Sequence, residues 1–302
     1  MLKNNFIVEP EPPYLLPGGK IGLSDPSDYF HTLAGVALWL GLPYWYARLL
    51  GQMQAWDELY RFQVWWVRQV RQYLDVRLDI GGLKRVDPHQ SYIVTPLHEG
   101  FGDILALAEL PLKMRFVARD ELFDQWKMLG PLLRDSGQLV VCPEQGAKSY
   151  RQLLRSAAPV FARGESLVIF PQGTILGIEN DFSGGAFALA KTFKLPILPI
   201  ALTGSHKVWE YPFSPRLRYG ERISLRVLAP ISVEECLARP REELRQMVQQ
   251  RLKQVALSGT MAPPRRFVPS RDGYWDGYAY RIDPQFSELA ADIERHRAAL
   301  IV

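Results

Sequence analysis

The chain has 302 residues, of which 47% are hydrophobic, and this composition excludes a wholly disordered protein and suits one large α/β domain with appended segments. Its 36 basic and 32 acidic residues leave a net charge of +4, which is too small and too dispersed to indicate a nucleic-acid partner. The two cysteines, Cys142 and Cys236, have no metal-ligand spacing around them, so we expect a reducing compartment.

The N-terminal region divides into an arm and an apolar segment. Residues 1–28 contain acidic and proline residues where a signal peptide requires an unbroken apolar core, so we interpret them as an irregular arm. The uncharged run that follows, residues 32–47, has 16 residues and contains Pro43. Because a bilayer crossing takes about 20 apolar residues, we expect this run to dip into the membrane or to lie in its surface.

The next segment, residues 52–75, combines aromatic and basic side chains on one predicted helix. Its aromatic residues are Trp56, Tyr60, Phe62, Trp65, Trp66 and Tyr73, and its arginines include Arg61, Arg68 and Arg71. This composition is typical of helices at membrane interfaces, where rings lie at headgroup depth and arginines meet anionic lipid. Residues 29–75 are therefore predicted to form a membrane-associating helical pair; the alternative is a pair packed on the domain with its aromatics in the core.

From residue 76 to 258 the pattern changes to short β-branched runs separated by helical stretches. Helices are predicted to begin near Asp103, Glu121, Ala147 and Gly185, and residues 233–257 are helical in periodicity apart from a break at Pro240. The predicted strands are 76–80, 91–97, 115–119, 138–143, 166–171, 196–202 and 223–230. We expect an α/β domain with a largely parallel central sheet flanked by helices, followed by a C-terminal extension at 259–302.

The hexapeptide HEGFGD, residues 98–103, is the first candidate for chemistry. His98 follows an apolar strand and precedes Gly100, Gly102 and the predicted helix start at Asp103. A tight glycine turn can fold Asp103 back toward the imidazole, which would fix the tautomer and leave the other ring nitrogen as a general base. The alternative is a plain glycine turn with Asp103 as a helix cap.

The second candidate is the stretch SLVIFPQGTIL, residues 166–176, where a buried strand ends in Phe170, Pro171, Gln172, Gly173 and Thr174. Pro171 and Gly173 predict a stiff, exposed turn whose backbone N–H groups can face an anion or a developing oxyanion. The alternative is an ordinary loop between a strand and a helix.

HEGFGD, FPQGT and the later GGAFALAKTFKLPILPIAL, in this order, resemble the glycerolipid acyltransferase family, which includes the bacterial 1-acylglycerol-3-phosphate acyltransferases. His98 and Asp103 match the family's His-x4-Asp block, residues 170–174 its FPEGT block, and the last stretch its VPIVPV-like strand. The resemblance covers roughly residues 77–230, and the ordered combination is more specific than any single block.

The resemblance implies a mechanism and a set of partners. His98, oriented by Asp103, would deprotonate the hydroxyl of a lysophospholipid or related lipid as it attacks the thioester of acyl-CoA or acyl carrier protein. The turn from Phe170 to Thr174 would help to position the acceptor headgroup. Neither a metal nor a further cofactor is implied, and both reactants are amphiphiles, so we expect a peripheral or monotopic protein on the cytoplasmic face of a membrane.

Several positions depart from the family pattern. Gln172 replaces the glutamate of FPEGT, Ile175 replaces the arginine that follows it, and Pro143 stands where the second block has an arginine. An arginine that binds a phosphate bidentately is not replaced by Ile or Pro, so a headgroup other than that of lysophosphatidate becomes a candidate. Charge could come instead from Arg119, Lys148, Arg151 or Lys207, unless these are surface residues.

Three interpretations other than an acyltransferase are considered for these motifs. A noncatalytic lipid-binding or membrane-scaffold protein of the same fold is the alternative to an enzyme. A Ser-His-Asp hydrolase is disfavoured because no G-x-S-x-G occurs, and a metal site built from His98, Glu99 and His206 is disfavoured because no HExxH occurs.

Overall fold

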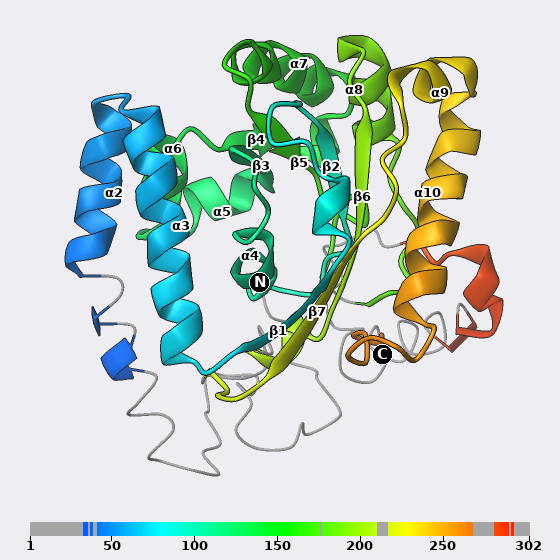
Figure 1. The fold of residues 1–302 in the computed structure, drawn as a ribbon. Helices are drawn as coiled ribbons and strands as arrows, with labels where there is room; N and C mark the ends of the chain where they lie inside the picture. Colours follow the sequence, from blue (N-terminus) through cyan, green and yellow to red (C-terminus); the bar gives the residue numbers. More distant parts are fainter. Residues whose placement is uncertain are drawn as a thin grey trace, which may run out of the picture.

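The computed structural model describes residues 33–35, 37–38, 41–175, 177–209, 217–267, 281–289 and 291–292. The predicted arm at 1–28 lies outside these residues. Within them, the chain forms a central sheet of seven strands with helices on both faces (Figure 1). The strands are β1 (Arg77–Gly81), β2 (Ile93–Pro96), β3 (Met114–Arg119), β4 (Leu139–Val141), β5 (Ser166–Val168), β6 (Ile197–Thr203) and β7 (Arg222–Val227).

The helices alternate with these strands along most of the chain. The α-helices are α2 (Leu42–Gln52), α3 (Trp56–Tyr73), α4 (Asp103–Leu107), α5 (Asp120–Asp124), α6 (Leu129–Asp135), α7 (Ala147–Ala162), α8 (Gly185–Phe193), α9 (Val233–Ala238) and α10 (Arg241–Ala256). The short 3-10 helices are η1 (Leu83–Arg85), η2 (Pro143–Gln145), η3 (Ser205–Lys207) and η4 (Pro284–Phe286). Every predicted strand is present, the helix starts agree with the prediction, and the break at Pro240 separates α9 from α10.

The sheet is largely parallel, as predicted. Its order is β1-β7-β6-β2-β5-β3-β4, and the pairs from β6 to β4 are all parallel. β7 runs antiparallel to β6, and β1 runs parallel to β7, so these two strands point the opposite way. The strands β6, β2 and β5 are therefore adjacent and end at the same edge of the sheet.

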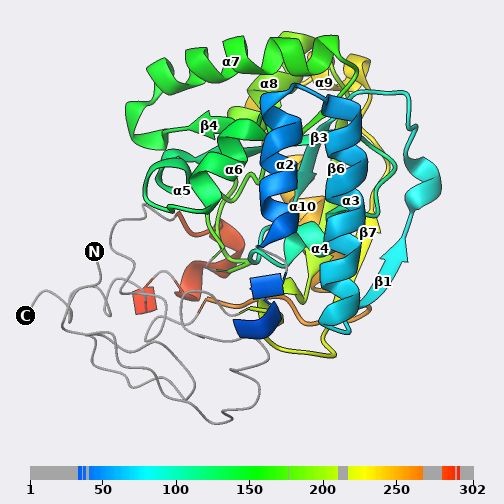
Figure 2. The ribbon, with the colours of Figure 1, turned by 90° about the vertical axis from the view of Figure 1, so that its left-hand side faces the viewer.

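Two hydrophobic cores cover the two faces of the sheet. Because successive residues of a strand point to opposite faces, Ile93 and Leu167 pack in one core while Val94 and Val168 pack in the other. The first core takes side chains from α7, α8 and α10, and the second takes them from α4 and from the last turns of α3. Figure 2 shows the view onto α2 and α3, with the sheet behind them.

The helices α2 and α3 form an antiparallel pair that also packs on α6. Ala47 and Leu50 of α2 meet Leu59 of α3 in a small buried cluster, which Leu132 of α6 joins. Arg48 binds Asp135 at the end of α6 with an Nε–Oδ2 distance of 2.5 Å. The pair is therefore attached to the domain through one face of α2, which packs on α6, and through the last turns of α3, which pack on the second core.

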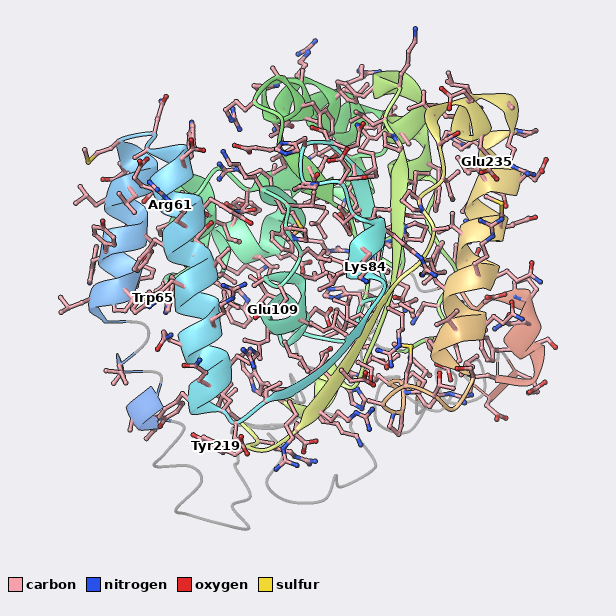
Figure 3. The ribbon with its side chains drawn as sticks, viewed as in Figure 1. Arg61, Trp65, Lys84, Glu109, Tyr219 and Glu235 are labelled. Carbon is pink, nitrogen blue, oxygen red and sulfur yellow. The ribbon has the colours of Figure 1, made fainter. Side chains whose placement is uncertain are left out.

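The aromatic residues of α3 mostly pack against protein, as in the alternative considered above. The guanidinium groups of Arg115 and Arg163 lie 4.7 and 5.5 Å from the Trp56 ring, while Phe62 and Trp66 line the cluster with α2. Of the six aromatics, Trp65 is the one with half of its surface exposed, and Figure 3 shows it on the side of α3 nearest α2. Across the part of the chain that the structure describes, every helix is too short or too polar to cross a bilayer.

The edge strand β1 is held to β7 by one carboxylate as well as by its backbone. Asp79 Oδ2 accepts hydrogen bonds from Arg226 Nη2 at 2.8 Å and from Arg222 Nη2 at 2.5 Å. These two bonds lower the pKa of Asp79 to about 2. Because this pKa lies below the unfolded value of about 3.9, the ionised carboxylate stabilises the fold above that pH, and the stabilisation disappears as the pH falls toward 2.

We predict that Asp79→Asn lowers the free energy of unfolding at pH 7 by about 0.5–1 kcal/mol, the range for partly exposed ion pairs. Urea denaturation at pH 7, 4 and 2.5 measures this, and the difference from the wild type should be smallest at the lowest pH. Asp75→Asn is the control, since Asp75 is exposed and lies 3.8 Å from Arg77. A deficit for Asp79→Asn that is the same at all three pH values would contradict the assignment.

Candidate active site

The candidate site lies at the carboxyl ends of three adjacent parallel strands. His98 follows β2, Phe170 and Gln172 follow β5, and Ser205 follows β6. Since β2 lies between the other two in the sheet, residues more than seventy positions apart in the chain meet at one edge. In open α/β sheets this edge is where ligands bind.

His98 and Asp103 form the pair that their spacing predicted. His98 Nδ1 lies 2.6 Å from Asp103 Oδ2, and the His98 side chain is 24% exposed while that of Asp103 is 2% exposed. The imidazole therefore reaches the surface and the carboxylate is buried behind it. This asymmetry suits a base that meets a substrate on one side and an orienting group on the other.

The glycine turn brings Asp103 back to the imidazole. Gly102 occupies the N-cap position of α4, and Asp103 is the first residue of the helix, so the capping alternative is wrong for Asp103. Its Oδ2 instead accepts hydrogen bonds from the backbone N–H groups of Glu99 at 3.1 Å and Gly100 at 3.4 Å. The carboxylate thus closes the loop that carries His98.

The stretch after β5 supports the imidazole. The Phe170 ring stacks on the His98 ring with 3.9 Å between centroids and 21° between planes. Gln172 is buried; its Oε1 accepts the His98 backbone N–H at 2.6 Å and its Nε2 donates to the Gly177 carbonyl at 2.9 Å. A glutamate has no N–H for the second of these bonds, which gives a physical reason for glutamine at this position.

Of the other residues of the FPQGT turn, Gly173 alone is exposed. Pro171 and Thr174 are buried, whereas Gly173 is exposed and adopts a left-handed conformation with φ of 67°. The Gly173 N–H donates to the Phe170 carbonyl at 3.1 Å, so this amide closes the turn. A headgroup role for residues 170–174 stays a prediction, with Gly173 as the exposed point of the turn.

Two further residues of the site, Ser205 and Glu99, were not assigned these roles from the sequence. Ser205 Oγ donates to Asp103 Oδ1. The Glu99 carboxylate accepts from the backbone N–H groups of Gly204 at 2.6 Å and Arg265 at 2.8 Å, and it lies 2.9 Å from His206 Nδ1. Both oxygens of Glu99 are therefore hydrogen-bonded to protein N–H groups. This disfavours the metal site of His98, Glu99 and His206 that was considered above as an alternative.

Arg265 belongs to the predicted C-terminal extension. Its backbone links two loops of the site, because its N–H donates to Glu99 and its carbonyl accepts from Ile178 N at 2.9 Å. Further along, Asp283 accepts from the fully buried Lys253 of α10 at 2.7 Å. The described part of the extension is thus bonded to the α/β domain.

Three side chains that could bind a cation lie together at the ends of β3 and β4. Among the described residues, Asp120, Cys142 and Glu144 place potential ligand atoms within 4.8 Å of one another. Glu144 also accepts from Arg119 Nη2 at 2.6 Å, so part of its charge is neutralised. A hydrogen bond to Asp120 raises the pKa of the Cys142 thiol, which keeps the sulfur protonated and weakly nucleophilic at neutral pH.

The sequence of the α/β domain is similar to that of known proteins. The model of the family described as Acyltransferase matches residues 77–203. The chain is 27% identical over 163 residues to a 1-acyl-sn-glycerol-3-phosphate acyltransferase of Bacillus subtilis, covering 53% of this chain and 80% of the relative. It is also 27% identical over 247 residues to a lyso-ornithine lipid O-acyltransferase of Pseudomonas aeruginosa, covering 76% of this chain and 91% of the relative.

The fold has a counterpart among solved structures. The crystal structure of the 1-acyl-sn-glycerophosphate (LPA) acyltransferase PlsC from Thermotoga maritima aligns with a TM-score of 0.61 at 18% identity, covering 78% of this chain and 95% of PlsC. The family match, the relatives and the fold agree with the motifs at the edge of the sheet and support an O-acyltransferase of the glycerolipid type.

Proposed function

We propose that this protein transfers a fatty acyl group from acyl-CoA or acyl carrier protein to a hydroxyl of a lysophospholipid or related lysolipid, with His98 as the general base. The observation that carries this proposal is the 2.6 Å contact between His98 Nδ1 and the buried Asp103 carboxylate. It orients the imidazole from behind while the ring remains partly exposed.

The reaction follows from this orientation. With its Nδ1–H donated to Asp103, the neutral imidazole presents Nε2 as the acceptor of the substrate's hydroxyl proton. The hydroxyl oxygen attacks the thioester carbonyl, the carbon–sulfur bond breaks as the tetrahedral intermediate collapses, and the thiolate takes the proton from the imidazolium. The acyl group thus passes directly to the acceptor oxygen and the proton passes to the thiolate, with no acyl-enzyme.

We predict that His98→Ala lowers kcat by about 10²–10⁴-fold, the contribution of a positioned acid–base group. Transfer of labelled acyl groups from acyl-CoA and from acyl carrier protein to a panel of lysolipids measures it. His89→Ala is the matched control, because His89 is an exposed histidine in a turn before β2.

Two results would contradict the proposal. Transfer at the wild-type rate by a folded His98→Ala variant would remove His98 as the base. A wild-type protein that transfers from neither donor to any acceptor, yet binds the lipids, would favour the noncatalytic lipid-binding scaffold.

The headgroup site departs from one built for a phosphate monoester. Pro143 and Ile175 occupy the positions of two family arginines, and Arg119 is already bound to Glu144. Lys148 and Arg151 are exposed on α7. The described residues at the ends of β3 and β4 thus offer the carboxylates of Asp120 and Glu144, which supports an acceptor whose headgroup does not depend on bidentate arginine contacts.

We therefore predict that a lyso-ornithine lipid, the acceptor named for one of the relatives, is acylated with a kcat/KM at least about tenfold above that of lysophosphatidate, since each tenfold step takes only 1.4 kcal/mol. Steady-state rates with both acceptors, at one donor concentration, measure this preference. Equal or faster transfer to lysophosphatidate would show that other groups bind the phosphate.

The surface of α2 supports attachment to a lipid bilayer. Leu42, Trp45, Tyr46, Leu49 and Met53 recur at helical spacing and are between 48% and 85% exposed. The opposite face of the same helix is buried in the protein, so both faces of α2 are apolar. Exposed aromatic and aliphatic side chains along one helix suit the lipid headgroup boundary, where the acceptor also resides.

We predict that the double substitution Trp45→Glu/Leu49→Glu lowers liposome binding by at least about tenfold, because each side chain contributes about 1.5–3 kcal/mol on transfer out of water. Flotation with anionic vesicles measures it. The matched control is Leu237→Glu/Leu257→Glu, which alters exposed leucines near α9 and α10. Equal flotation of the two variants would mean that α2 does not contact lipid.

A further inference from the structure

The turn after β6 completes the environment of Asp103. Ser205 is fully buried and its hydroxyl donates to Asp103 Oδ1, while His98 and two backbone N–H groups use Oδ2. Each carboxylate oxygen therefore has its own partner. With only one oxygen bound, the carboxylate could rotate about its Cβ–Cγ bond; with both bound, its plane is fixed toward the imidazole.

Glu99 holds Ser205 in place from both sides. A single oxygen of this buried carboxylate, Oε2, contacts the backbone N–H of Gly204 and Nδ1 of His206, the residues before and after Ser205. Gly204 itself has φ of +87°, a conformation that favours glycine. The turn is thus built so that its middle residue points at Asp103.

One glycine of HEGFGD is required by this contact. A Cβ on Gly102 would lie 2.6 Å from the Ser205 carbonyl oxygen and 3.3 Å from its Cβ. Any larger residue would push the turn away from the loop that carries Asp103. Two features therefore allow the two loops to approach closely. One is the missing side chain of Gly102, and the other is the conformation of the Gly204–His206 turn.

We propose that Ser205 is a positioning residue for acyl transfer, which acts through the Asp103 carboxylate to hold the His98 imidazole in its productive orientation. This inference rests on the proposed function of His98. Being fully buried, Ser205 does not reach the substrate, so it should influence the rate of the chemical step and leave acceptor binding unchanged.

The first test is Ser205→Ala. We expect kcat to fall by about 10–100-fold with KM within a factor of two, the effect of losing one hydrogen bond to a buried charged group. Without its hydroxyl donor, the carboxylate holds the imidazolium more tightly, so the acid limb of the pH–kcat/KM profile should move to higher pH. Ser205→Thr keeps the hydroxyl and should recover most of the rate.

Ser166→Ala is the matched control. Ser166 is also buried and its Oγ accepts the Tyr92 N–H at 3.0 Å, but it lies at the start of β5, at the opposite edge of the sheet. We expect it to lower thermal stability without changing kcat or the pH profile. If Ser205→Ala does not fold, Ser205→Cys replaces it, because a thiol fills the site with a weaker donor.

A double-mutant cycle separates positioning from general support of the fold. If Ser205 acts through the carboxylate, Ser205→Ala added to Asp103→Asn should cost less than about twofold beyond Asp103→Asn alone. A residue that merely supports the fold would reduce the two backgrounds by the same factor.

The role of Ser205 and the role of His98 can be contradicted separately. Independent losses in the cycle, or a Ser205→Ala variant with wild-type kcat and pH profile, would overturn the positioning role while an inactive His98→Ala variant left the proposed function intact. A fully active His98→Ala variant would instead overturn the proposed function itself.

Discussion

The buried carboxylate of Asp103 is the constraint on which the rest of the site depends. A carboxylate that is 2% exposed is costly unless its oxygens are hydrogen-bonded. Here a ring nitrogen, two backbone N–H groups and a hydroxyl surround it. Meeting these demands requires a tight turn at 98–102 and a second turn after β6, so the same contacts that make the charge tolerable also orient His98.

The parallel arrangement of β6, β2 and β5 brings the loops of the site together. The loops that follow three adjacent strands meet at one edge, and each contributes a different group: the imidazole of His98, the stacked ring of Phe170 and the hydroxyl of Ser205. Gln172 joins two of the loops through a neutral amide that both donates and accepts. Glutamine in place of the glutamate of the FPEGT motif is therefore compatible with an intact His98–Asp103 pair.

The N-terminal helices show two different uses of apolar residues. On α3 most aromatics pack against protein, and Arg68 and Arg71 form ion pairs with Glu109. Figure 3 shows Glu109 on the side of α3 that faces the sheet. On α2 one face packs on α6 while the other exposes Trp45, Leu49 and their neighbours. Composition alone does not distinguish these cases, because the same aromatic residues suit a protein core and a lipid interface.

The amino-acid sequence by itself determined the strands, their largely parallel arrangement, the His98–Asp103 pair and the resemblance to glycerolipid acyltransferases, because hydrophobic periodicity and short-range spacing are local properties. It did not reveal that Gln172 bonds to the His98 backbone, or that Ser205 and Glu99 complete the site. Those contacts join residues between 74 and 166 positions apart. Only the order of strands in the sheet decides which distant loops meet, and neither composition nor periodicity specifies that order.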